Sequence, residues 1–184
     1  MKWAIDKSFD FCYGHRVHNQ QLNTEYSLDG CLACRHLHGH QGKIKIFLES
    51  DYLQEGMVTD FKHLNWFKKF LDDTLDHKFI MDINDPLLSH EVPEYCNEGI
   101  LDLSKCHIQE PEMYWTPDLE VIKDGPQAVF EKYEGMVFVD FVPTSENICA
   151  WLLSVAERKM EPLGVRVSAV EFWETPKSHC RVES

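Results

Sequence analysis

Apolar and polar residues alternate along the first fifteen positions of the chain. Trp3, Phe9 and Phe11 fall on one parity, and Asp10 falls on the other. Alternation with a period of two is typical of a strand with one buried face. The sequence therefore predicts an N-terminal strand whose buried parity continues to His15.

The same reasoning predicts further strands and two helices. Residues 61–76 place leucines and Phe67 at spacings of three and four with lysines opposite, which is typical of an amphipathic helix, and Asp60 is a suitable N-cap. Further elements are strands at 42–50, 136–142, 165–174 and 179–182, and a second helix capped by Thr144 or Ser145. Helices segregated from these strands favour an α+β fold with an antiparallel sheet.

Residues 86–135 interrupt this order. The segment is rich in proline, shows no sustained period, and contains eleven acidic residues against three lysines, a net charge of −8 out of −13 for the chain. It is typical of an insertion with short elements rather than a second folded domain. We therefore expect one domain over residues 1–184, with residues 86–135 as an acidic insertion within it.

Charge and composition exclude several classes of protein. A net charge of −13 without a basic run argues against nucleic-acid binding. The chain has no signal-peptide pattern and no run of eighteen apolar residues, so we expect a cytoplasmic protein with no membrane contact. Seven unevenly spaced cysteines indicate reduced thiols or functional groups rather than a disulfide framework.

The stretch CLACRHLHGH, residues 31–40, holds two cysteines and three histidines. In an extended segment His38 and His40 project to one face and can reach one ion, and His15 becomes their neighbour if the two strands pair. Three imidazoles with an open position are typical of catalytic zinc. The alternative is a structural zinc knuckle in which Cys31 and Cys34 are ligands.

Two other places carry candidate chemistry. Asp76 precedes His77, and such a carboxylate can orient an imidazole, although a polar helix end is the better explanation of the pair taken alone. Glu174 shares the parity of Val170 and Phe172, so it either turns toward a buried face or lies in water at a strand edge.

Six motifs in order carry a resemblance to a known family. They are FCYGHR, CRHLHGH, GMVTDF, LDHKFIMDIND, PTSENICAW and VEFWET. Together they resemble the 6-pyruvoyl-tetrahydropterin synthase and 6-carboxy-tetrahydropterin synthase family. The resemblance covers the chain to about residue 85 and again from 136 to the end, and residues 86–135 correspond to a much shorter connection in compact members.

The resemblance implies a tunnelling fold (T-fold), in which a four-stranded antiparallel sheet is backed by two helices. Here a large insertion would precede the second helix. It also implies a homo-oligomer, commonly a hexamer made as a dimer of trimers, with active sites between subunits.

The resemblance further implies one Zn²⁺ held by His15, His38 and His40. Cys34 falls at the position of the family's catalytic thiol, with Asp76 and His77 as the paired acid-base group. Glu174 would anchor the pterin ring, and the same pocket would be lined by Thr144, Ser145 and Glu146. Cys31 and His36 receive no role.

The spacing between Cys34 and His38 resembles the carboxy branch. That branch converts the small molecule 7,8-dihydroneopterin triphosphate to 6-carboxy-5,6,7,8-tetrahydropterin, acetaldehyde and triphosphate, on the route to 7-deazaguanines such as queuosine. The alternatives are 6-pyruvoyl-tetrahydropterin synthase, which eliminates triphosphate, and a non-catalytic zinc module. Cys31 and the insertion depart from the compact pattern.

Overall fold

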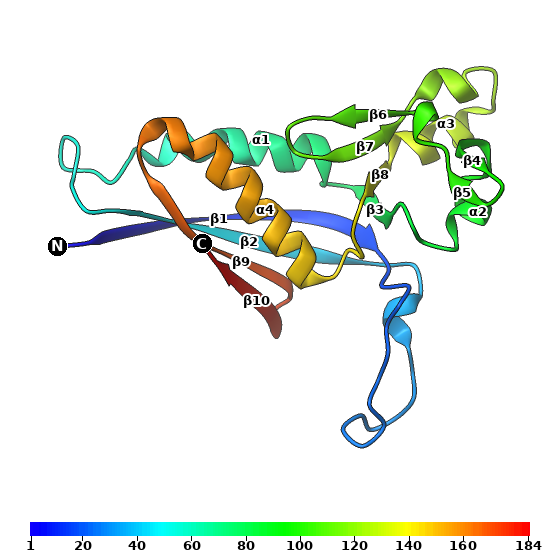
Figure 1. Cartoon of the computed structure of the whole chain (residues 1–184), viewed down its shortest axis with the longest axis horizontal. Coiled ribbons are helices and arrows are strands. Elements are labelled where there is room, and N and C mark those ends of the chain that lie inside the picture. Colours follow the sequence, from blue (N-terminus) through cyan, green and yellow to red (C-terminus); the bar gives the residue numbers. More distant parts are fainter. The chain divides into compact units, whose positions relative to one another are not determined.

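The computed structural model describes all 184 residues, which divide into two compact units. Unit 1 consists of residues 1–12, 40–76 and 145–184, and unit 2 of residues 13–39 and 77–144. Strands β1 (Trp3–His15) and β2 (His38–Ser50) run through both units. They are neighbours in the sheet and run in opposite directions (Figure 1).

Unit 1 combines the predicted antiparallel strands with two helices. Its other strands are β9 (Arg166–Thr175) and β10 (Ser178–Glu183), each antiparallel to its neighbour in the order β10-β9-β2. Its helices are α1 (Asn65–Thr74), which follows the 3-10 turn η2 (Phe61–Leu64), and α4 (Ser145–Met160), which is followed by η6 (Glu161–Leu163). The predicted N-cap is confirmed, because the Asp60 carboxylate accepts from the Lys62 N–H at 2.8 Å.

Aromatic side chains join the helices of unit 1 to its sheet. Phe67 of α1 is completely buried, and its ring centroid lies 5.3 Å from that of Phe9 on β1. Phe70 of α1 meets Trp151 of α4 with centroids 6.0 Å apart. The alternating pattern of β1 therefore buries its apolar parity as predicted.

Unit 2 contains the segment predicted as an insertion. Its strands are β3 (Lys78–Asp82), β6 (Cys106–Gln109), β7 (Tyr114–Pro117) and β8 (Met136–Val139), with a separate pair β4 (Cys96–Asn97) and β5 (Ile100–Leu101). Its helices are α2 (Leu88–Glu91) and α3 (Gln127–Glu134), and its 3-10 turns are η1 (Ala33–Arg35), η3 (Pro93–Tyr95), η4 (Leu103–Lys105) and η5 (Leu119–Ile122).

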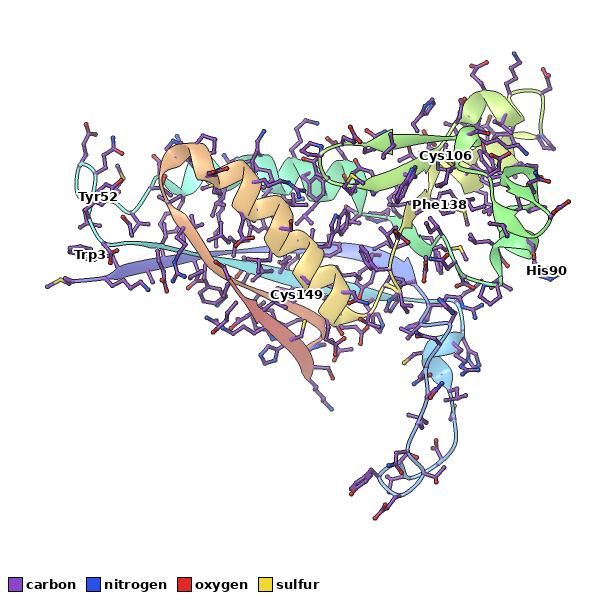
Figure 2. The ribbon with its side chains drawn as sticks, in the orientation of Figure 1. Trp3, Tyr52, His90, Cys106, Phe138 and Cys149 are labelled. Atoms are coloured by element: carbon purple, nitrogen blue, oxygen red, sulfur yellow. The ribbon has the colours of Figure 1, made fainter.

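The insertion shares a core with β3 and β8. Phe138 of β8, which Figure 2 labels, is completely buried, as is Tyr95, and Tyr133 is nearly so. The Tyr95 and Tyr133 rings lie 4.5 Å apart between centroids, and the Tyr133 hydroxyl donates to the Glu94 carboxylate. That hydrogen bond lowers the pKa of Glu94. The insertion thus buries its own aromatic residues.

The α+β class is confirmed, but the sheet is larger than expected. The pattern predicted five strands and the resemblance implied a four-stranded antiparallel sheet, whereas the structure has eight strands in the order β10-β9-β2-β1-β3-β8-β7-β6. β3 pairs in parallel with both β1 and β8. A short strand buried between parallel neighbours shows no alternation, so the pattern could not identify it. No helix of the structure is long and apolar enough to cross a membrane.

The contact between Phe67 of α1 and Phe9 of β1 can be tested by substitution. We expect Phe67→Ala to lower the free energy of unfolding by about 3–5 kcal/mol, because it removes a completely buried ring and leaves a cavity. Urea denaturation measures the change. Lys69→Ala on the same helix removes an exposed side chain and is the matched control. An equal loss in both variants would contradict the packing described here.

Candidate metal centre and active site

His15 is the last residue of β1 and is completely buried. Its Nδ1 lies 2.6 Å from the carbonyl oxygen of Pro143. A carbonyl oxygen can only accept a hydrogen bond, so Nδ1 carries the proton and donates it. In its neutral form the ring then presents the lone pair of Nε2, which is the form that binds a metal.

His38, the first residue of β2, has the same arrangement. Its Nδ1 lies 2.8 Å from the carbonyl oxygen of His36 and donates to it for the same reason. The rings of His15 and His38 have centroids 4.5 Å apart. The structure thus places next to each other two imidazoles that each have a fixed tautomer.

Glycines allow the strands that carry these histidines to approach closely. A Cβ at Gly39 would come within 2.8 Å of the backbone oxygen of Tyr13, and a Cβ at Gly14 would come within 2.4 Å of the Phe79 ring. A side chain at Gly39 would force the backbone of the two strands apart, whereas one at Gly14 would displace the Phe79 ring. The position of the His15 and His38 imidazoles therefore depends on Gly14 and Gly39.

His40 completes a group of three. It follows Gly39 on β2, and one nitrogen from each of His15, His38 and His40 lies within 4.8 Å of the others. Three neutral imidazoles are the donor set that suits zinc and similar divalent ions. The residues therefore fit a metal with three protein ligands and an open position, and they do not include Cys31, Cys34 or His36.

Cys34 lies in the turn η1, in the loop between β1 and β2. Its N–H donates to the Gln20 side chain at 3.0 Å, and its carbonyl accepts from Val17 N–H at 2.7 Å. The Arg35 guanidinium donates to the Gln20 carbonyl and so closes the same loop. These contacts hold the half-buried Cys34 in place, whereas Cys31 is exposed.

Asp76 and His77 lie in the segment that connects α1 to β3. The Asp76 carboxylate accepts from the Cys12 N–H of β1 at 2.7 Å. His77 has a φ of +58°, in the left-handed region that residues with a Cβ rarely occupy. The helix predicted to reach residue 76 ends at Thr74, and the left-handed residue redirects the chain into β3.

Glu174 lies near the end of β9 and is partly buried, beyond the fully buried Val170 and Phe172. Its carboxylate lies 3.7 Å from Nε2 of His40. The structure thus places Glu174 next to one histidine of the candidate metal centre. Three further residues were expected to line the pterin pocket. The Thr144 N–H donates to the Val142 carbonyl, Ser145 is the first residue of α4, and Glu146 lies in the first turn of that helix.

An ion pair and a histidine–carboxylate hydrogen bond that the sequence did not suggest follow His15 along the chain. Arg16 lies 3.2 Å from the Asp85 carboxylate, whose side chain is 1% exposed, and His18 lies 3.0 Å from that of Asp82. Burying these carboxylates requires such partners. The sequence does contain a signal for these contacts: the motif DIND places Asp82, Asn84 and Asp85 directly after an apolar run.

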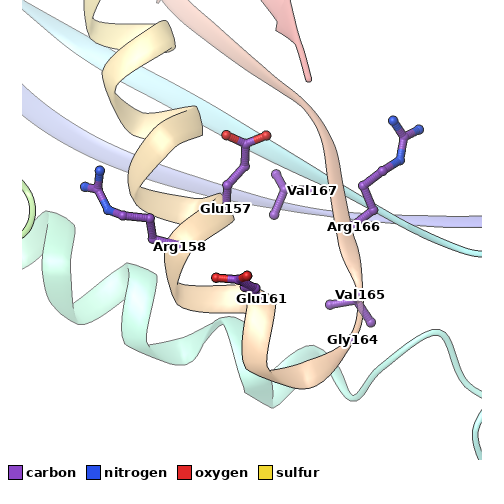
Figure 3. A pocket seen from close by; sticks show the side chains of 7 residues that line it. All are labelled: Glu157, Arg158, Glu161, Gly164, Val165, Arg166 and Val167. Atoms are coloured by element: carbon purple, nitrogen blue, oxygen red, sulfur yellow. The ribbon is translucent and has the colours of Figure 1, made fainter.

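The structure also contains a cavity without candidate chemistry. It has a volume of about 440 Å³ beside the C-terminal end of α4 (Figure 3). Its charged lining consists of Glu157, Arg158, Glu161 and Arg166, two residues of each sign, and it contains no histidine or cysteine. We therefore place the candidate functional site at the three imidazoles and not at this cavity.

Comparison with known proteins decides the family. The family model described as 6-pyruvoyl tetrahydropterin synthase matches residues 4–184. The chain belongs to this family of lyases. A 6-carboxy-5,6,7,8-tetrahydropterin synthase of Aquifex aeolicus is 32% identical over 190 residues, which are 97% of this chain and 96% of that one. One of Haemophilus influenzae is 24% identical over 98% of this chain and 99% of its own.

Solved structures agree on the fold of the family. An uncharacterized protein from Wolinella succinogenes is 54% identical, with a TM-score of 0.94 over 100% of this chain and 98% of that one. The 6-pyruvoyl tetrahydropterin synthase of Caenorhabditis elegans is 18% identical, with a TM-score of 0.55 over 100% of this chain and 96% of its own. The second likeness supports the predicted T-fold.

We expect His38→Ala to reduce the bound divalent metal from about one ion per chain to near zero, because it removes one of three ligands. His36→Ala is the matched control, since the His36 group that holds His38 is a backbone carbonyl and survives the substitution. Metal content after dialysis against zinc measures both. Metal retained in His38→Ala, or lost equally in His36→Ala, would contradict this ligand set.

The left-handed backbone at His77 gives a separate prediction. His77→Gly and His77→Ala remove the same imidazole, but only glycine adopts this conformation without strain. We expect the glycine variant to be more stable than the alanine variant by about 1 kcal/mol in urea denaturation. Equal stability of the two variants would show that the backbone at this position is relaxed.

Proposed function

We propose that the chain is a zinc-dependent 6-carboxy-5,6,7,8-tetrahydropterin synthase. It converts 7,8-dihydroneopterin triphosphate to 6-carboxy-5,6,7,8-tetrahydropterin with release of acetaldehyde and triphosphate. The observation that carries the proposal is the group of three imidazoles, two of which have tautomers fixed by backbone carbonyls. The identity of 32% with a relative of that name along 97% of the chain supports the reaction.

The metal is assigned to His15, His38 and His40. When bound there, Zn²⁺ supplies a Lewis acid that makes a hydroxyl of the substrate side chain easier to deprotonate. The protein holds the lone pairs of His15 and His38 toward one another through the carbonyls of Pro143 and His36.

The pterin ring is assigned to Glu174. A carboxylate can accept two parallel hydrogen bonds from the amino group and the N3–H of the ring, which fixes its orientation. Glu174 is partly buried and next to His40, so a ring held by this carboxylate also lies next to a histidine of the metal centre. Thr144, Ser145 and Glu146 are assigned to the same pocket.

Proton transfer is assigned to Cys34, Asp76 and His77. The Cys34 thiolate takes a proton from the substrate, and His77, oriented by Asp76, returns one. Cys34 is suited to this because its backbone is held at both ends by hydrogen bonds to the loop. Asp76 is itself fixed by the Cys12 N–H.

The biological setting is part of the proposal. The protein is cytoplasmic, acts in the formation of 7-deazaguanine compounds such as queuosine, and assembles as a homo-oligomer, a hexamer made from two trimers. The absence of a spanning helix and the membership of the family are compatible with this setting. The Cys34-to-His38 spacing favours the carboxy branch over the pyruvoyl branch.

The proposal is tested by mass analysis of the products formed from 7,8-dihydroneopterin triphosphate by the zinc-loaded protein. We expect 6-carboxy-5,6,7,8-tetrahydropterin together with acetaldehyde in equal amount. A product that keeps the whole side chain, with triphosphate as the only released fragment, would establish the 6-pyruvoyl reaction instead. No turnover by folded, fully metallated protein would refute both.

Two cysteine variants test the assigned thiol in the same assay. We expect Cys34→Ala to keep its zinc and to lose turnover by about a hundredfold or more, because the proton acceptor is gone. Cys31→Ala keeps both zinc and turnover, since Cys31 is exposed and outside the histidine group. Full activity of Cys34→Ala would refute its role, and zinc loss in both variants would favour a structural knuckle.

A further inference from the structure

Two cysteines of unit 1 lie where α4 packs on β9 and β10. Cys149 of α4 is completely buried, and its Sγ donates to the Val170 carbonyl of β9 at 3.2 Å (Figure 2). Cys180 of β10 is half-buried, and its Sγ donates to the Ser145 carbonyl of α4 at 3.1 Å. Neither cysteine belongs to the machinery assigned above.

The secondary structure brings these two thiols together. Ser145 and Cys149 are four residues apart, so within α4 they lie on one face, one turn above the other. On the sheet, Cys180 is directly opposite Phe172, which is completely buried, so its side chain points to the same face, toward α4. The Cys180 sulfur therefore touches the helix one turn from Cys149.

The two thiols differ in acidity. When the Cys149 S–H donates to the Cys180 sulfur instead of to the Val170 carbonyl, it lowers the pKa of Cys180 by more than burial raises it. The same hydrogen bond, together with burial, raises the pKa of Cys149. Cys180 is thus the thiol that ionises first and is also the more accessible of the two, which are the properties of an attacking thiol.

We propose that Cys149 and Cys180 form a dithiol redox site that hydrogen peroxide oxidises to an intramolecular disulfide. The Cys180 thiolate attacks the peroxide, an S–O bond forms, the O–O bond breaks, and water leaves after protonation, giving a sulfenic acid. The Cys149 thiol then attacks that sulfur, the S–S bond forms and the S–O bond breaks, and the leaving hydroxide takes the Cys149 proton and departs as a second water. Two thiols lose two electrons, which reduce the peroxide to water.

The disulfide would alter the position of residues that are assigned to the pterin pocket. It would join β10 to the first turns of α4, where Ser145 and Glu146 are assigned to the pterin pocket, and Glu174 lies just before the turn that leads into β10. The bond also removes the thiol that donates to the Ser145 carbonyl. This consequence rests on the proposed function, whereas the disulfide itself does not.

Peptide mapping tests the disulfide. The reduced full-length protein is treated with increasing hydrogen peroxide, alkylated with iodoacetamide and digested with trypsin. Cleavage after lysine and arginine places Cys149 in residues 133–158 and Cys180 in residues 178–181, and neither peptide has another cysteine. We expect a linked peptide lighter by two hydrogens, which dithiothreitol separates.

Two variants serve as controls for this mapping. Cys180→Ser abolishes the linked peptide, and Cys149→Ser leaves a sulfenic acid at Cys180 that dimedone traps. If Cys180 is oxidised to sulfinic acid while Cys149 is fully alkylated in the wild-type protein, the redox site is refuted. Linkage of either cysteine mainly to a third one refutes it as well.

Pterin binding, followed by fluorescence, tests the consequence separately. We expect the linked wild-type protein to bind a pterin about tenfold more weakly than the reduced protein, because the contacts are displaced, and dithiothreitol to restore binding. Cys180→Ser shows no such reversible loss. Unchanged binding by the linked protein refutes the coupling to the pocket. Failure of the reduced protein to bind pterin refutes the proposed function, and the linked peptide still decides the redox site.

Discussion

A backbone carbonyl can only accept a hydrogen bond, and the candidate metal centre depends on this constraint. Because Pro143 and His36 each present a carbonyl to Nδ1 of a histidine, the protons of His15 and His38 have one possible position. Side-chain acceptors could rotate or change protonation, whereas the carbonyls are fixed by the backbone. The protein therefore sets the ligand form of these rings without using an additional charged group.

The same region shows why close backbone approach matters for chemistry. Gly14 and Gly39 bring the ends of β1 and β2 nearer to their neighbours than residues with a Cβ would permit. The ion pair of Arg16 and the hydrogen bond of His18 then hold the chain directly after His15. Gly14 and Gly39 allow close packing, and the buried carboxylates of Asp82 and Asp85 bind the residues that follow His15. Both features fix the position of the end of β1.

Much of this arrangement could be predicted from the sequence, and the exceptions have physical causes. Periodicity identified β1, β2, α1, α4 and β9 because each has one buried face. It did not identify β3, whose parallel pairing on both sides leaves no polar parity, or β6 and β7, which are too short. The histidine group could be anticipated from spacing, but the carbonyl of Pro143 could not, because it is 128 residues from His15.

That separation has a consequence for how the protein matures. During synthesis His15 emerges early, but its carbonyl partner follows only after the whole insertion and β8 have been made. A contact of such long range forms late, since the intervening chain must be ordered first. The nascent chain therefore cannot make this hydrogen bond until it is nearly complete, so the ring orientation at the candidate metal centre is set only late.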